Sequence, residues 1–272
     1  MSDLEDFEGD AGLFEEPDDF RPPPPESHFA TYKRKLANAE PSEITLKLVG
    51  KSPLWGHLLW NAGIFTADYL DKNAVDLVKN KKILELGAAS GLPGLVSALN
   101  DAKLVVSTDY PDPDLLSHIQ YNFDLLNEQY KGQLSKYIVK GYIWGNNVGP
   151  ILYPKEEEDK ELSDKEISEV EDEDKFDLII LSDLVFNHTE HHKLLTTCRK
   201  TLKKDGKCLV VFSPHRPHLL HKDLEFFETA EKEYEFKSHQ VSMVNWTPMF
   251  QEDEETVEIR SRVYCFLLSA NW

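Results

Sequence analysis

The sequence of 272 residues has few cysteines, no cluster of basic residues and no long apolar run. It holds 30 Lys and Arg against 49 Asp and Glu, a formal charge of −19. Because phosphate backbones and anionic lipids attract clustered cations, this composition argues against nucleic-acid and membrane partners. No stretch approaches the roughly 20 apolar residues that cross a bilayer. Cys198, Cys208 and Cys265 are too few and too scattered for a disulfide framework or a zinc site. We therefore expect a cytoplasmic protein with reduced thiols and no metal centre.

Two segments hold most of the negative charge. Residues 1–26 contain ten acidic residues, one arginine and the run Pro22–Pro25, and residues 155–175 contain twelve acidic residues and four lysines. Because proline fixes φ and donates no backbone hydrogen bond, we expect 1–26 to be a disordered tail, or else a strip that docks on the protein or a partner. Residues 155–175 sustain no apolar period and predict an acidic loop inserted into a domain over 27–272.

The remaining sequence alternates between strand-like and helix-like segments. The strand-like runs are Lys82–Leu86, Leu104–Thr108, Tyr137–Tyr142, Phe176–Leu181 and Cys208–Phe212, and the helix-like stretches are Leu92–Asn100, Asp114–Tyr130, His188–Leu202 and Leu219–Glu235. Short apolar runs separated by helices imply parallel strands buried on both faces. Ser238–Asn245 and Val257–Leu268 are also strand-like, with only a loop between them. The expected fold is α/β: a Rossmann-like, seven-stranded, mostly parallel sheet with helices on both faces and an antiparallel C-terminal strand.

A glycine turn follows the first of these runs. Gly87-Ala88-Ala89-Ser-Gly91 opens a helix, where small residues let a ligand approach the backbone and free N–H groups. The spacing differs from the dinucleotide fingerprint, because Ala89 stands where the second glycine would allow approach of a pyrophosphate. NAD and FAD are therefore disfavoured.

An acidic residue ends the second run, as expected for a ribose-binding site. Asp109 lies 22 residues beyond Gly87, at the position that typically receives a pair of ribose hydroxyls. Asp112 or Asp114 is better placed to cap the next helix, which leaves Asp109 for the ribose. Composition and spacing thus reach a nucleoside-binding α/β domain.

Together these residues resemble the seven-β-strand S-adenosylmethionine-dependent methyltransferases, over roughly residues 52–268. Within that superfamily the chain resembles the branch that methylates protein lysines, because it has a Trp before the first core strand and another after the third. The acidic start from Gly12 and the motifs Ser52-Pro-Leu-Trp-Gly-His-Leu-Leu-Trp-Asn-Ala-Gly63 and Ser182-Asp-Leu-Val-Phe-Asn-His-Thr-Glu190 are similar to the fungal methyltransferases of translation elongation factor 1-alpha. That family modifies the N-terminal amine and the adjacent lysine, and its members were earlier described as nicotinamide N-methyltransferases.

The resemblance implies S-adenosylmethionine as the cofactor and assigns residues to it. Trp60 would flank the cofactor, Trp144 would lie beside the adenine, and Ser182 matches the small residue at the end of the fourth strand. Gly87, Ala88, Ala89 and Asp109 would form the rest of the pocket. Glu85, which precedes the turn, would hold either the loop amides or the cofactor's amino group.

The resemblance also implies where the substrate binds. Asp183 would be catalytic and anchor the target amine, with Phe186, Asn187 and His188 at the substrate entrance. A polar residue that merely starts a helix is an equal alternative for His188. Related lysine methyltransferases carry Asp-x-x-Tyr here, whereas this sequence has Phe186, so a tyrosine hydroxyl cannot be invoked. His191 is expected on the exposed side of the next helix.

The expected partner is a protein substrate, elongation factor 1-alpha, bound by a monomer. One alternative is methylation of a small amine such as nicotinamide, and another is an inactive adaptor that binds the cofactor. An NAD-linked oxidoreductase is disfavoured by Ala89 and by the two tryptophan positions.

Overall fold

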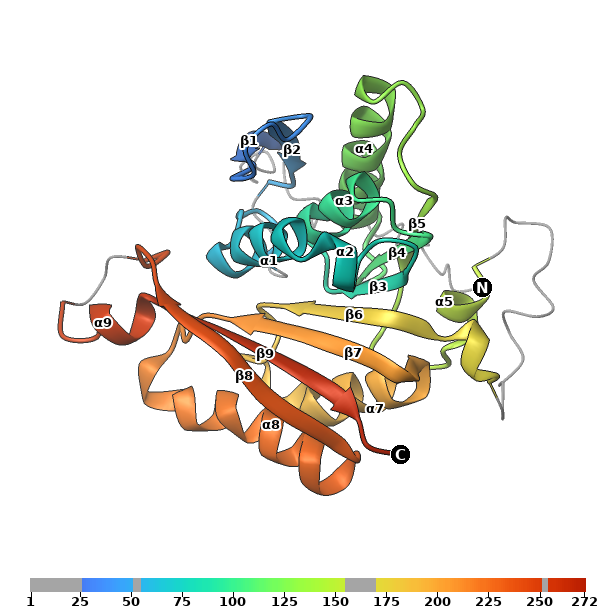
Figure 1. Cartoon of the computed structure of the whole chain (residues 1–272). Helices are drawn as coiled ribbons and strands as arrows, with labels where there is room; N and C mark the ends of the chain where they lie inside the picture. The colour runs from blue at the N-terminus through green and yellow to red at the C-terminus, as the bar shows by residue number, and fades with distance from the viewer. Residues whose placement is uncertain (1–25, 51–54, 155–169, 251–253) are drawn as a thin grey trace, which may run out of the picture.

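A seven-stranded sheet in the order β5-β4-β3-β6-β7-β9-β8 forms the centre of the molecule (Figure 1). The structure is a computed structural model that describes residues 26–50, 55–154, 170–250 and 254–272. Neighbouring strands from β5 to β7 pair in parallel, and β9 pairs antiparallel with both β7 and β8. The bounds are β3 (Lys82–Leu86), β4 (Leu104–Asp109), β5 (Tyr137–Gly141), β6 (Phe176–Ser182), β7 (Leu202–Phe212), β8 (Phe236–Asn245) and β9 (Arg262–Ala270).

Helices cover both faces of this sheet. Figure 1 shows α1 and α3 on one side and α7 and α8 on the other. The helices are α1 (Asn61–Lys72), α2 (Ala74–Leu77), α3 (Leu92–Leu99), α4 (Pro113–Gln129), α5 (Gly149–Leu152), α7 (His191–Thr201), α8 (Leu220–Glu233) and α9 (Val257–Arg260), with 3₁₀ turns η2 (Asp172–Asp174), η3 (His188–Glu190) and η4 (Pro217–Leu219).

Alternation of side chains along the strands divides the core into two layers. In β3, Ile83 joins the cluster that includes α1, α3 and α4, whereas Leu84 and Leu86 join the cluster with α5, α7 and α8. Successive strand residues point to opposite faces, so a strand covered on both sides needs a continuous apolar run. This is the pattern that the sequence shows, and the expected seven-stranded, mostly parallel fold is confirmed.

A separate hairpin precedes the sheet and packs on α4. It consists of β1 (His28–Lys33) and β2 (Glu43–Leu48), which pair antiparallel. The side chain of Asn122 in α4 accepts from the Lys47 amide at 2.7 Å and donates to the Lys47 carbonyl at 3.0 Å. The sequence analysis does not predict this hairpin, since its strands, HFATYK and EITLKL, mix apolar and polar residues and contain no continuous apolar run.

The C-terminal part of the sheet differs from the expectation in detail. The antiparallel ending is confirmed, but β9 lies between β7 and β8 and leaves β8 at the edge. Val257–Leu268 is not one strand, because Val257–Arg260 forms the short helix α9 and β9 begins at Arg262.

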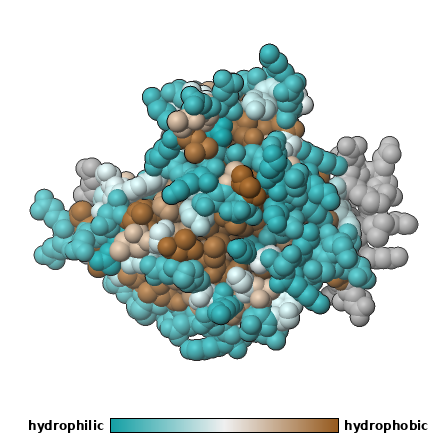
Figure 2. Space-filling view, viewed as in Figure 1, coloured by the Kyte–Doolittle hydropathy of each residue, from teal (hydrophilic) through white to brown (hydrophobic). Residues whose placement is uncertain are grey.

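Most of the expected tail 1–26 and residues 155–169 of the expected loop lie outside the described residues. Of residues 170–175, three form η2. Among the described residues, no helix is long and apolar enough to cross a membrane. Figure 2 shows a mostly hydrophilic face with an apolar band across its middle, over β8 and β9.

Candidate functional site

Most of the residues expected to be functional follow the carboxyl ends of β3, β4, β5 and β6, and Trp60 immediately precedes α1. Parallel strands end at one edge of the sheet, and open α/β sheets bind ligands outside that edge. The loop after each of these strands therefore faces the same region, although the loops are far apart in sequence.

The bend after β3 requires glycine. Gly87 has φ +61° and Gly91 has φ +76°, both in the left-handed region. A Cβ atom on Gly87 would lie 2.5 Å from Cδ2 of Leu184 and 3.3 Å from Cζ2 of Trp144. The bend thus passes close to the Trp144 ring, and a side chain at position 87 would collide with Leu184.

The two alanines of the bend have different environments. Ala88 is buried in the core cluster, and its amide donates to the carbonyl of Thr108 at 2.9 Å. Ala89 is half-buried, with φ +50°, and its amide points to β4. The bend is therefore fixed by the neighbouring strand rather than by its own side chains.

Asp109 holds this bend from the end of β4. Its Oδ2 accepts from the Ala89 amide at 2.7 Å, and its Oδ1 accepts from the Tyr110 amide at 2.7 Å. Burial raises the pKa of Asp109 above its ordinary value, while the two amides oppose the rise. A carboxylate has about four lone-pair sites, so two remain for other donors such as hydroxyls. Asp112, in contrast, caps α4 by accepting from the Leu115 amide at 3.0 Å, as expected.

Glu85 lies beneath the bend and is fully buried. Its carboxylate accepts from Oγ of Ser107 at 2.7 Å and from the Gly94 amide in α3. Burial raises the pKa of Glu85 to about 8, against the opposing effect of these two donors. The side chain thus holds an amide of the helix that follows the bend, and a contact with the cofactor stays a prediction.

A second group of residues surrounds Asp183 at the end of β6. Asp183 has φ +60°, and its amide donates to the Val211 carbonyl at 2.7 Å. Its Oδ1 accepts from the Ser213 amide at 3.2 Å, and its Oδ2 accepts from Nε2 of His215 at 2.9 Å. The preceding Ser182 accepts a hydrogen bond from Thr66 of α1 at 3.3 Å. Sequence reasoning missed His215, since nothing in the sequence connects positions 32 residues apart.

Trp60 belongs to this second group. Its ring lies 5.0 Å from that of His215 and 6.1 Å from that of Phe250, both at steep angles. Its Nε1 donates to the Trp55 carbonyl at 3.1 Å. The structure therefore brings Trp144 to the glycine bend and Trp60 to Asp183 and His215.

One of the expected entrance residues, His188, belongs to a second His–Asp pair. Nε2 of His188 donates to Oδ1 of Asp223 at 2.7 Å, and Arg216 donates to the Phe186 carbonyl. Asn187 is half-buried and accepts from the Thr189 hydroxyl. The expectation for His191 is wrong: the ring is buried, and its Nε2 donates to the Val185 carbonyl at 2.7 Å.

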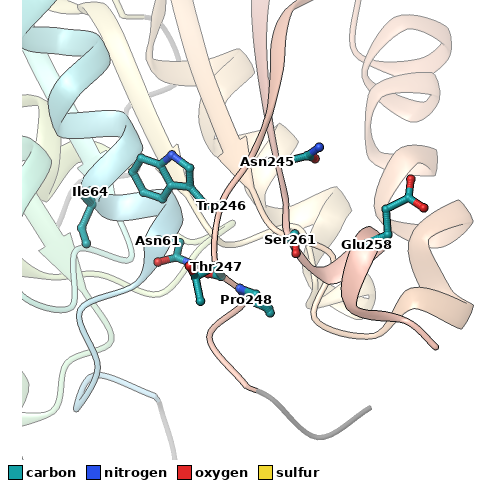
Figure 3. Close-up of a pocket in the computed structure, with 8 residues that line it drawn as sticks. All are labelled: Asn61, Ile64, Asn245, Trp246, Thr247, Pro248, Glu258 and Ser261. Carbon is teal, nitrogen blue, oxygen red and sulfur yellow. Dashed lines mark hydrogen bonds between the residues drawn. The ribbon is translucent and has the colours of Figure 1, made fainter. Parts of the chain in front are cut away.

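A cavity of about 790 Å³ lies at the same edge, beside the ends of β8 and β9 (Figure 3). It is lined by Asn61, Ile64, Asn245, Trp246, Thr247, Pro248, Glu258 and Ser261. Figure 3 shows the Trp246 ring next to α1, and the side chain of Asn61 donates to the Thr247 carbonyl at 2.7 Å. A smaller cavity of about 440 Å³ lies beyond the ends of β4 and β5, against Pro111 and Tyr142.

These residues fit S-adenosylmethionine. The cofactor needs a bend without side chains, an acceptor for its sugar hydroxyls and an apolar wall for its adenine, and Gly87, Asp109 and Trp144 offer these. The contacts themselves stay predictions. Within the described part of the chain, no group of three His, Cys, Asp or Glu side chains is arranged to hold a metal ion.

Comparison with known proteins gives a family and a fold. A family model described as lysine methyltransferase matches residues 40–233. Proteins named "Protein N-terminal and lysine N-methyltransferase EFM7" are similar over nearly the whole length: 63% identical in Candida albicans, covering 98% of this chain and 97% of that protein, and 58% in Debaryomyces hansenii, covering 97% of each. The relative of that name from Schizosaccharomyces pombe is 42% identical over 97% of this chain and 96% of its own.

Solved structures show the same fold at low identity. A protein from Streptococcus mutans assigned as a SAM-dependent methyltransferase has a TM-score of 0.54 at 13% identity, covering 90% of this chain and 55% of that one. This chain therefore spans about half the length of that neighbour. A second neighbour, solved with SAH, has a TM-score of 0.54 at 11% identity, covering 82% of this chain and 53% of that one.

Proposed function

Since the chain belongs to the lysine methyltransferase family and uses S-adenosylmethionine as its cofactor, we propose that it methylates the N-terminal amine and the adjacent lysine of translation elongation factor 1-alpha. The observation that carries this proposal is the likeness, over nearly the full chain, to relatives named protein N-terminal and lysine N-methyltransferase. The choice of elongation factor 1-alpha as the substrate rests on the resemblance of the motifs around Trp60 and Asp183 to the fungal methyltransferases of that factor.

The chemistry of the site supports an amine acceptor. When bound, S-adenosylmethionine supplies a methyl group already activated by a positive sulfur, so the chain has to align and desolvate the amine. Asp183 carries the negative charge that would draw an ammonium to the end of β6, and Trp60 and Phe250 are apolar walls beside it. Aromatic walls that exclude water favour the neutral amine, which is the form that attacks.

The two amines differ in how much help they need. An α-amino group has a pKa of ~7.7–8.0, which leaves roughly a tenth of the molecules neutral near pH 7. A lysine with a pKa of ~10.4 is neutral in only about one molecule in 2,500. An enzyme that methylates both amines therefore needs a way to deprotonate the lysine, which the α-amino group does not require.

The arrangement along the sheet edge supports a protein substrate. The glycine bend, Asp109 and Trp144 lie at the β3–β5 half, Asp183 lies at β6, and the larger cavity lies beside β8 and β9. Its volume of about 790 Å³ is within the range of ligand-binding clefts. In our proposal the substrate chain enters from the β8–β9 side and presents its amine to Asp183.

The proposal includes a cytoplasmic monomer, because translation takes place in the cytoplasm and one chain contains every residue that the proposed chemistry uses. Gel filtration with light scattering measures the mass in solution, and a dimer at micromolar concentration would remove that part of the proposal.

Intact-mass analysis tests the function. Fungal elongation factor 1-alpha with a free N-terminus is incubated with the enzyme and S-adenosylmethionine, and peptide mapping then locates the added methyl groups. We expect methyl groups on the N-terminal nitrogen and on the adjacent lysine. Two control substrates, one acetylated at its N-terminus and one with arginine in place of that lysine, should each lose one site.

Transfer to nicotinamide with none to the protein would replace this proposal with a small-amine methyltransferase. Tight binding of the elongation factor without any transfer would replace it with an adaptor.

A further inference from the structure

His215 stands between Asp183 and the open side of the site. Each carboxylate oxygen of Asp183 already accepts one hydrogen bond, one from the Ser213 amide at 3.2 Å and the other from Nε2 of His215 at 2.9 Å. The Asp183 side chain is 7% exposed, whereas that of His215 is 19% exposed. An amine that enters from outside therefore meets the imidazole as well as the carboxylate.

The hydrogen bond to Asp183 fixes the tautomer of His215. An ionised carboxylate only accepts hydrogen bonds, so Nε2 of His215 carries a proton, and Nδ1 presents a lone pair when the ring is neutral. Among the hydrogen bonds of the described residues, none involves Nδ1. The ring is also oriented by Trp60 at 5.0 Å and by Phe250 at 6.3 Å. The neutral imidazole thus presents a hydrogen-bond acceptor beside two aromatic rings.

We infer that His215, oriented by Asp183, accepts the proton of the substrate's lysine nitrogen before methyl transfer, an inference that rests on the proposed function. The geometry of the pair leads to it. The His215–Asp183 pair, joined by a hydrogen bond of 2.9 Å, supplies a base and the carboxylate that orients it at the sheet edge where open α/β sheets bind ligands.

One N–H bond of the lysine ammonium breaks, its electron pair stays on nitrogen, and the proton passes to Nδ1 of His215. The neutral nitrogen then forms a bond to the methyl carbon as the carbon–sulfur bond breaks with its pair left on sulfur, so the positive charge moves from sulfur to nitrogen. His215 releases its proton to water when the product leaves.

Several charges act on His215. Burial favours the neutral ring, but Asp183 through its charge and hydrogen bond, together with Asp223, outweighs burial and raises the pKa of His215, and Arg216 opposes the rise. His188 bonds to Asp223 from η3. A higher pKa makes the imidazole a stronger base, and burial of the lysine lowers the pKa of its ammonium, so the two values approach each other.

The test uses the full-length chain with His215→Gln. Glutamine can still donate an N–H to Asp183 but offers no basic nitrogen, so it separates orientation from proton acceptance. The substrates are the two proposed above, one with only the lysine available and one with only the N-terminal amine. His239→Gln, an exposed histidine on β8, is the matched control and should behave as the wild type.

We expect His215→Gln to lower kcat on the lysine substrate about 100-fold at pH 7, within the range of a general base. The loss on the N-terminal substrate should be under about 10-fold, because that amine is already partly neutral. The lysine rate of the variant should rise roughly tenfold per pH unit from 7 to 9, and cofactor affinity measured by calorimetry should be unchanged.

Equal losses on both substrates at every pH, or wild-type rates, would overturn the inference. If wild-type enzyme methylates neither substrate, the proposed function fails and this inference with it. Should the variant not fold, the wild-type pH profile decides instead: kcat on the lysine substrate should rise with pH and level off as His215 becomes neutral. A rise that continues to pH 10 excludes His215.

Discussion

Asp183 occupies a backbone position that few residues adopt. Its φ of +60° lies in the left-handed region, which Asp and Asn enter more readily than other non-glycine residues. Asp183→Asn should therefore keep the backbone. The amide group, however, presents N–H to a histidine nitrogen that also carries a proton, and this favours the other tautomer of His215.

We expect Asp183→Asn to reduce kcat by 100-fold or more, while cofactor affinity changes less than about threefold. In a serine protease the same kind of change, which leaves the geometry but selects the wrong tautomer, costs about 10⁴ in kcat. Steady-state kinetics and calorimetry measure the two quantities. Turnover equal to that of the wild type would remove Asp183 from the mechanism.

Glu85 makes stability depend on pH. Burial raises its pKa to about 8, from an ordinary value of 4.5, so between these values the folded chain keeps a proton that the unfolded chain releases. The free energy of unfolding therefore falls as the pH rises through this window. Glu85→Gln should be more stable than the wild type by a few kcal/mol at pH 9 and by little at pH 5.

Urea unfolding at pH 5, 7 and 9 measures this difference, and Glu225→Gln, an exposed glutamate on α8, is the control. A variant whose stability follows that of the wild type at all three values would show that Glu85 does not titrate in this range.

At this scale the sequence indicated residues whose roles are local. Asp112 is expected to cap α4, and it accepts a hydrogen bond from the amide of Leu115, only three residues further along the chain. The pairing of Asp183 with His215 has no local sign, because it depends on β6 and β7 lying side by side. The same holds for His188 and Asp223, which meet only after α8 has packed.

Among the elements, the N-terminal hairpin is joined to the site through one side chain. Asn122 of α4 bonds both backbone groups of Lys47 in β2, and it also donates to the Ser90 carbonyl in the glycine bend at 3.0 Å. Arg34, just after β1, forms a double hydrogen bond with Asp71 in α1 at 2.7 and 2.8 Å. The hairpin thus braces the two helices that flank the bend.

Asn122→Ala should lower the free energy of unfolding by about 2–3 kcal/mol, because it leaves three backbone groups without partners. Cofactor affinity should also fall, since the Ser90 carbonyl loses its fixed position. Asn127→Ala, on the same helix but bonded to Leu134, is the control for a general effect on α4. Unchanged affinity together with lowered stability would show that the hairpin does not reach the bend.

The central strands could be predicted because each is a short apolar run of the length that a two-sided sheet requires. The hairpin could not, since its six-residue strands become stable only by packing on α4. Helix α9 was read as part of a strand because Val257 and Ile259 are β-formers, and tertiary context overrides that preference.

For the whole molecule, charge is the dominant property. The chain carries a formal −19, concentrated in two segments. A substrate protein with a basic surface would be drawn to it, and such steering weakens as salt screens the field. Amide replacements at Asp3, Glu5, Asp6, Glu8 and Asp10 should lower kcat/KM for the protein substrate about 3- to 10-fold at low salt. The difference should vanish near 0.5 M salt, and equal rates at low salt would exclude steering.

The position of β9 between β7 and β8 has a consequence for biosynthesis. During translation β8 is synthesised before β9, so β8 leaves the ribosome without a strand to pair with, and one edge of β7 stays unpaired. Only when residues 262–270 have been translated can β9 pair with β7 on one side and with β8 on the other. A message that stops before Arg262 therefore yields a product in which β7 and β8 both have unpaired edges. Such a product is prone to aggregate and is a target for chaperones and proteases.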